Sequence, residues 1–297
     1  MKSKLKCALP LLIIFFSCTS LPEQTASMSD DDAVGPEAET ASINVVTPEQ
    51  AEPEPKPEPE IEAVKQRYYM SASSSYLSNG VLDTKTEYQY EGKLLVIEQT
   101  FYADGTRAGS VENTYQGGLV VLKAKKDPSE ITISAHSYRY DSAGYLIRDS
   151  LLDEKGNPIF SYVYDYDEKG RRTQLRILSN DDLLLSYAEY RYEGDKNIRT
   201  DIYSAGGELQ EYLERTYNDL NQPVLELIIE VGGSEIEKVR FEYSEGKQTG
   251  REVYRHTRKT GSEIFRYDEF GNLSTRIRID RSGSLVETIE YVYEEVQ

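Results

Sequence analysis

Residues 262–293 read SEIFRYDEFGNLSTRIRIDRSGSLVETIEYVY and contain one complete copy of the unit that builds this chain. Tyr267 and Tyr293 hold equivalent places in two successive copies of it. Between them, apolar residues such as Ile277 alternate with charged residues such as Arg276, which is the period of a β-strand with two unlike faces. The turn sequences YDEFGN and RSGS divide the stretch into segments of strand length, so the unit predicts a β-hairpin.

The unit recurs along the chain, and each copy is marked by an anchor tyrosine that ends one strand. Self-similarity at a fixed period, here about 25 residues, is typical of repeat proteins, in which one small supersecondary unit is copied and stacked. The anchors are Tyr90, Tyr115, Tyr140, Tyr166, Tyr192, Tyr217, Tyr243, Tyr267 and Tyr293.

Two turns separate the strands of each unit, and the first directly follows the anchor. It reads YDSAGY, YDEKGR or YDEFGN, or takes the shorter forms YEGK, YEGD and YSEGK. An aspartate followed three positions later by glycine is typical of a type I turn that ends in a left-handed residue. Asp141, Asp167 and Asp268 are therefore interpreted as turn formers and not as catalytic acids. The predicted turn glycines are Gly92, Gly144, Gly170, Gly194, Gly246 and Gly271.

The predicted fold is all-β, with about eight to nine tandem two-strand hairpin repeats of about 25 residues in residues 67–297. We expect one long curled antiparallel sheet or a β-solenoid-like array. Open twisted sheets rarely exceed about ten strands without curling or splitting, so the sheet must bend until its tyrosine-bearing side is covered. The sequence does not choose between an open spiral, a closed tube and a sandwich. We expect the tyrosines in the core; a sugar- or peptide-binding platform is the alternative.

Residues 1–17 have the pattern of an export signal, with lysines at the start and the apolar run ALPLLIIFF at positions 8–16. This run is shorter than the roughly 20 residues that span a bilayer as a helix. Phe15-Phe16-Ser17-Cys18 resembles a bacterial lipobox, although Phe15 departs from the usual leucine. The resemblance implies lipidation of Cys18, for example with palmitate, and membrane anchoring through that lipid. The alternative is an ordinary secretory signal with a chance cysteine.

Residues 18–66 are rich in Glu, Pro, Ser and Thr and contain AEPEPKPEPEIE at positions 51–62. This composition predicts a disordered acidic tether that follows the lipidated cysteine. The acidic run at 30–32 is interpreted as solvated charge and not as a metal site. Removing the signal would change the formal net charge from -18 to -21, because three lysines and no acid are lost. Such a charge argues against binding to nucleic acid.

The units YDSAGYL, YDEKGRR and YDEFGNL resemble the YD repeats of bacterial Rhs-type secreted proteins and of related repeat lipoproteins. The YEGK and YEGD turns are similar to those that begin MORN-type hairpin repeats. The resemblance covers about residues 68–297 and implies a repeat scaffold. Rhs repeats wind into a β-shell around a toxin cargo. The repeats here are fewer and their period is longer, and we expect neither a cargo domain nor a self-cleavage region, so we do not expect the resemblance to extend to encapsulation.

Little in the sequence indicates chemistry. His136 and His256 lie in different repeats, and neither has metal-ligand spacing to other residues; His136 is interpreted as a core or rim residue. The acids of YDYDEKG, at positions 165, 167 and 168, lack the remaining ligands of a calcium loop. No nucleotide-binding or hydrolase motif is present. We therefore predict no catalytic residue, no metal site and no cofactor.

Three function classes remain open. The preferred interpretation is a non-catalytic binding or structural module, exported and lipid-anchored to a bacterial membrane, facing the periplasm or the cell surface. Its candidate partners are an envelope protein or a glycan. The first alternative is an outer-membrane β-barrel, because strands that alternate between a polar and an apolar side also describe one. The second is a polysaccharide-active enzyme with an aromatic groove. The sequence does not say whether the inner or the outer membrane holds the lipid.

Overall fold

The computed structural model describes residues 68–295. The predictions for the signal peptide, Cys18 and the acidic tether fall outside these residues. Every element of the described part is a β-strand, and no helix there is long and apolar enough to cross a membrane. The all-β prediction is therefore confirmed.

Eighteen strands follow one another, each joined to the next by a short turn. They are β1 (Tyr68–Leu77), β2 (Leu82–Glu91), β3 (Leu94–Tyr102), β4 (Arg107–Gln116), β5 (Leu119–Lys126), β6 (Thr132–Tyr140), β7 (Leu146–Leu152), β8 (Pro158–Tyr166), β9 (Arg172–Ser179), β10 (Leu184–Glu193), β11 (Lys196–Ser204), β12 (Leu209–Tyr217), β13 (Pro223–Glu230), β14 (Glu235–Ser244), β15 (Lys247–Arg255), β16 (Arg258–Tyr267), β17 (Leu273–Asp280) and β18 (Leu285–Glu295).

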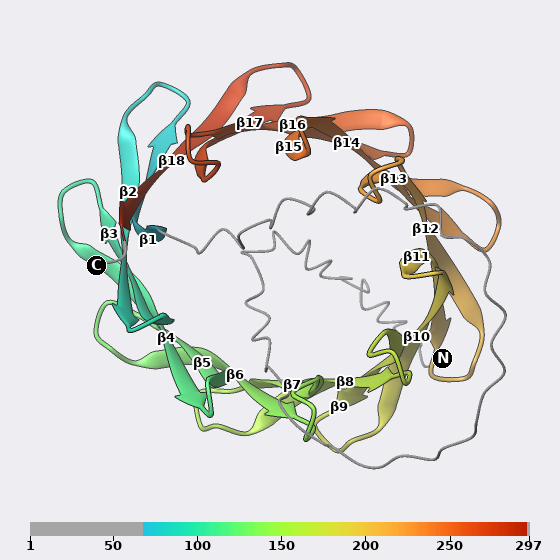
Figure 1. Ribbon diagram of the computed structural model, residues 1–297. Coiled ribbons are helices and arrows are strands. Elements are labelled where there is room, and N and C mark those ends of the chain that lie inside the picture. Colours follow the sequence, from blue (N-terminus) through green and yellow to red (C-terminus); the bar gives the residue numbers. More distant parts are fainter. Residues whose placement is uncertain (1–67, 296–297) are drawn as a thin grey trace, which may run out of the picture. The chain divides into compact units, whose positions relative to one another are not determined.

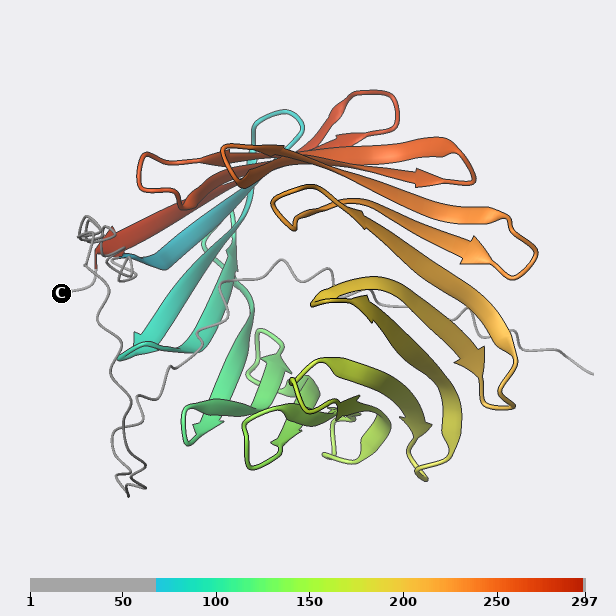
Figure 2. The same ribbon diagram turned by 45° about the vertical axis from the view of Figure 1, so that its right-hand side comes forward.

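The sheet closes on itself. Each strand pairs antiparallel with its neighbours in sequence, and β1 pairs with both β2 and β18, for example through Ser73 opposite Tyr291. The eighteen strands therefore form a single barrel, seen as a ring of hairpins in Figure 1 and obliquely in Figure 2. The prediction of one long curled sheet or a solenoid-like array is wrong. Closure pairs the backbone groups that an open array would leave unpaired at its two edges.

An extra residue in the strand that follows each of eight anchors gives the sheet its bend. At Tyr267, for instance, Arg266 lies opposite Thr275 but Tyr267 lies opposite Leu273, so Ser274 is the extra residue. The same shift occurs at the anchors from Tyr90 to Tyr243. Such bulges bend a strand and increase its local twist. A bulge in every repeat thus supplies the curvature that the repeat period alone does not reveal.

The turns after the anchors are built as the sequence predicts. Asp167 accepts hydrogen bonds from the backbone N–H groups of Lys169 and Arg171, both at 2.9 Å. Gly170, between them, has a φ of +75°, a conformation that favours glycine. Asp141 and Asp268 accept the corresponding pairs of bonds. All six predicted turn glycines have positive φ.

Candidate functional site: the tyrosine face of the barrel

The strands have two unlike faces. The tyrosine face carries the anchors and every second residue before them, and the charged face carries the residues between. Three residues before the anchors, six of nine positions on the charged face are charged: Glu87, Glu112, Glu189, Glu214, Arg240 and Glu290. Four residues before the anchors, on the tyrosine face, Glu263 is the one Asp, Glu, Lys or Arg among nine. The middle of most anchor strands is therefore polar on one side and mostly apolar on the other.

The anchor hydroxyls form a ladder of hydrogen bonds. Eight of the nine donate to a backbone carbonyl 19 or 20 residues earlier, at 2.8 to 3.0 Å. Tyr217, for example, donates to the carbonyl of Asn197. This bond explains why the anchor is tyrosine and never phenylalanine, a signal that the sequence analysis missed. The donors are Tyr115, Tyr140, Tyr166, Tyr192, Tyr217, Tyr243, Tyr267 and Tyr293.

Neighbouring hairpins also stack at the anchors. Tyr145 lies with its ring centre 5.1 Å from that of Tyr166, and the guanidinium of Arg171 lies 4.9 Å from the ring centre of Tyr192. Both partners end the turn that follows the preceding anchor, so they hold the same place in their repeats. Aromatic pairs and cations over aromatic rings each contribute about 0.5–1.5 kcal/mol beyond burial. The anchors thus join successive repeats by ring contacts as well as by hydrogen bonds.

The tyrosine face points into the barrel. Burial is the largest cause that raises the pKa of Tyr88, Tyr138 and Tyr164, and it raises the pKa of Tyr293 to about 12. On the charged face, the largest cause that raises the pKa of Tyr254 is its hydrogen bond to Glu252. Side chains converge on the concave side of a closed wall and diverge on its convex side, so the more buried face is expected to be the concave one. We therefore assign the tyrosine face to the lumen.

Burial also raises the pKa of one tyrosine on the charged face, Tyr203. Its ring stacks on that of Tyr187 with the centres 4.7 Å apart. The desolvation of Tyr203 is thus accompanied by a local ring contact, whereas burial raises the pKa of eight anchors along the tyrosine face.

The lumen also contains charged groups. Glu263, only 7% exposed, forms an ion pair with Arg251 at 2.5 Å and accepts hydrogen bonds from Arg276. His136 does lie on the tyrosine face, with its Nδ1 at 2.8 Å from the carboxylate of Asp149. A buried carboxylate needs such partners, because removal from water disfavours its charged form. The charged groups of the lumen described here therefore bond to one another within the barrel wall.

The charged face holds its ions in pairs. Asp201, 1% exposed, lies between the guanidinium groups of Arg191 and Arg199. Asp165 pairs with Arg176 at 3.0 Å on the same side. Two members of the YDYDEKG cluster are thus engaged, because Asp167 also pairs with Arg171. Within residues 68–295, no group of three or more His, Cys, Asp or Glu side chains could hold a metal ion.

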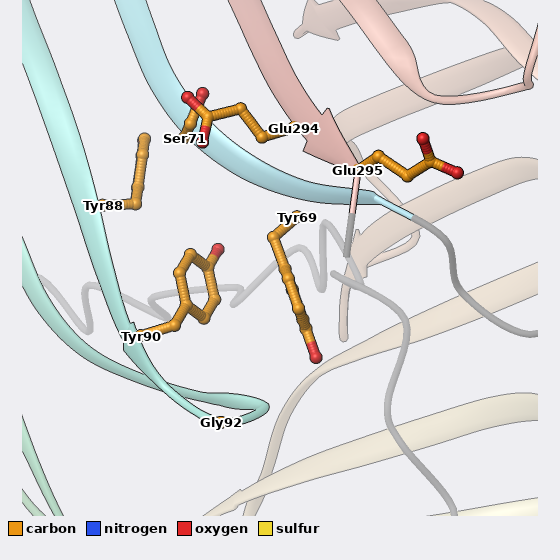
Figure 3. Close-up of a pocket in the computed structure, with 7 residues that line it drawn as sticks. All are labelled: Tyr69, Ser71, Tyr88, Tyr90, Gly92, Glu294 and Glu295. Atoms are coloured by element: carbon orange, nitrogen blue, oxygen red, sulfur yellow. The ribbon is translucent and has the colours of Figure 1, made fainter. Parts of the chain in front are cut away.

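A small pocket of about 260 Å³ lies where the barrel closes, between β1, β2 and β18. Figure 3 shows the rings of Tyr69 and Tyr90 side by side there, with their centres 4.8 Å apart. Glu294 reaches across β1 toward Ser71, whereas the Glu295 side chain points away. Tyr90 is the one anchor whose hydroxyl donates no bond to a carbonyl within the described strands. The closing seam therefore departs from the regular ladder.

No family model matches this chain, and no curated protein matches its sequence. A search of solved structures found a chain in the crystal structure of TcdB2-TccC3-Cdc42, with 14% identity, a TM-score of 0.37, and coverage of 75% of this chain and 12% of that chain. It also found a porin-like protein from Bacteroides uniformis, with 12% identity, a TM-score of 0.38, and coverage of 76% of this chain and 98% of the other. A porin-like protein from Bacteroides vulgatus follows, with 10% identity, a TM-score of 0.25, and coverage of 76% and 99%. All three scores lie below 0.5, so the description of the fold rests on the strand pairing.

Proposed function

We propose that this protein is a hollow β-barrel of the bacterial outer membrane. The observation that carries the proposal is closure: eighteen antiparallel strands form one barrel with no free edge. Closure supports the outer-membrane β-barrel alternative better than the interpretation as a repeat scaffold. Barrels of 16 to 18 strands are wide enough to leave an aqueous interior. The lumen would therefore admit small molecules along its tyrosine-lined wall.

The distribution of charge decides how such a barrel would stand with respect to the bilayer. A wall that faces lipid carries an outward apolar band about 25 Å tall, and an arginine or lysine at the bilayer midplane costs about 2–4 kcal/mol there. The outward face of this barrel instead has charged residues at six of nine mid-strand positions. We propose that the barrel stands in water at the membrane surface, attached through the predicted lipid on Cys18.

A second candidate is a barrel that crosses the bilayer as a pore. The strand number is even, and the strands have 7 to 11 residues, close to the roughly 9–11 that a tilted membrane strand needs. In that arrangement the charged face would have to meet the lipid, because the tyrosine face lines the lumen. Conductance across a planar bilayer after addition of the purified full chain would favour this candidate.

The test is a spin label at Ile264→Cys in outer-membrane vesicles that hold the full chain. Ile264 is mid-strand on the charged face and 38% exposed. We expect the label to be relaxed by a water-soluble nickel complex and not preferentially by oxygen, which concentrates in lipid. The parent chain, treated with the same reagent, controls for labelling of its own cysteines. Preferential relaxation by oxygen would instead place the charged face in the bilayer, and absence of the protein from these vesicles would contradict the location.

A further inference from the structure

Arg172 occupies an unusual position at the start of β9. It lies opposite the anchor Tyr166 on the tyrosine face. Its guanidinium carbon is 4.3 Å from the ring centre of Tyr164 and 5.8 Å from that of Tyr190. Its Nε is buried and makes no hydrogen bond. A cation is therefore held between two phenol rings on the wall of the lumen.

Arg172 also lacks a carboxylate partner in the described part of the chain. Three other arginines have a buried Nε without a hydrogen bond, but each forms an ion pair: Arg107 with Glu130, Arg176 with Asp165, and Arg251 with Glu263. No ion pair involves Arg172 within residues 68–295. The acid Asp149, whose charge acts on Tyr164, is already bonded to His136. Arginine that is removed from water is nearly always paired, so this guanidinium has unused capacity to bind an anion.

We propose that Arg172, with the rings of Tyr164 and Tyr190, forms a binding site for a carboxylate borne on a ring-shaped ligand such as an acidic sugar. The planar guanidinium fork matches a carboxylate, to which it can donate two parallel hydrogen bonds. A single unpaired cation surrounded by neutral phenols balances one negative charge and not the two of a phosphate dianion. The phenol faces beside it would pack against the apolar face of the ligand's ring.

The proposal deepens the proposed function by naming a ligand class for the lumen, and its test is independent of the location of the barrel. The purified full chain in detergent would be titrated calorimetrically with D-glucuronate, with D-glucose and with inorganic phosphate. We expect saturable binding of glucuronate that is at least about tenfold tighter than that of glucose or phosphate, as expected of a charge-assisted pair. Added sodium chloride should weaken it.

The variant Arg172→Gln should weaken the binding of glucuronate at least about tenfold, because it removes the charge and the fork. Arg172→Lys, which keeps the charge but loses the fork, should give an intermediate affinity. Arg176→Gln is the matched control, since Arg176 lies on the same strand but on the opposite face, and it should bind as the parent does. Circular dichroism would show that each variant keeps its strands, and Arg172→Lys provides the comparison if Arg172→Gln does not fold.

Several outcomes would overturn the site. One is the absence of saturable binding of glucuronate to the parent. A second is binding of glucose as tight as that of glucuronate, which would show that the carboxylate is not recognised. A third is tighter binding of phosphate than of glucuronate, which would show that the proposed ligand class is wrong. Glucuronate affinity that is unchanged in folded variants of Arg172 would place the binding elsewhere. The spin-label experiment at Ile264 tests only where the barrel lies, so its outcome does not change the interpretation of these binding measurements.

Discussion

The two faces of the same strand differ in burial and in role. On β16, Glu263 and Phe265 point into the lumen and are buried, whereas Ile264 and Arg266 point outward and are exposed. The inward face stabilises the barrel by packing rings and by bonding most of its polar groups. The outward face tolerates charges because most of them remain in water, and Asp201 between two arginines is its buried exception. The same hairpin repeat therefore has one face that determines stability and one that determines what surrounds the barrel.

The largest expected effect is loss of the fold at alkaline pH, because the tyrosines of the inward face are buried. Burial raises the pKa of Tyr90 and Tyr293 to about 12, and it raises the pKa of Tyr138 and Tyr164 as well. A raised folded-state pKa contributes stability that is fully present below pH 10 and is lost as the pH rises through the folded pKa. We expect the barrel to unfold between about pH 10 and pH 12, with tyrosinate absorption and loss of β-sheet circular dichroism changing together. Phenols that ionise near pH 10 while the sheet persists would show that the rings face water.

Removing one carboxylate from each face should give unequal losses. Glu263→Gln leaves Arg251 and Arg276 without their shared buried partner, and it should lower the free energy of unfolding by about 3–5 kcal/mol. Asp165→Asn breaks the ion pair with Arg176 on the charged face, where both side chains are more than a third exposed, and it should cost about 0–1 kcal/mol. Urea denaturation of both variants and the parent measures the difference.

Equal losses from these two variants would mean that burial in the lumen does not distinguish the faces. A double variant that replaces Glu263 and Arg251 with residues of similar volume sharpens the comparison. It should lose less stability than Glu263→Gln alone if the cost comes from an unpaired buried arginine.

The sequence predicted the local features of the fold but not its closure. The alternation around Ile277, the turn formed by Asp167 and the rings of the anchors follow from neighbouring residues, and the structure has each of them. Closure depends on the pairing of β1 with β18, the first and last strands of the described chain. It also depends on the bulge in every repeat, which the repeat period does not encode.

The functional residues were only partly predictable. The anchors were found because they recur, and His136 was placed on the correct face by counting in twos from Tyr140. Arg172 gave no signal in the sequence, because an arginine after a turn resembles the many solvated arginines of this chain. Its distinction lies in the partners that the fold brings to it, two rings from neighbouring strands, and in the carboxylate that the described residues do not bring. Such a site can be recognised only after the strands are placed.

The smallest expected effect concerns the anchor hydroxyls, which test whether the ladder adds to the stacking of the rings. Tyr217→Phe keeps the ring but removes the bond of 2.8 Å to the carbonyl of Asn197, so it should cost about 0.5–1.5 kcal/mol. Tyr212→Phe is the control on the charged face, because the Tyr212 hydroxyl makes no hydrogen bond within residues 68–295 while its ring lies under Arg199 at 3.7 Å. It should leave the urea midpoint unchanged. If the two variants lose the same stability, the constancy of tyrosine at the anchors would have to come from the ring alone, and phenylalanine would serve there equally well.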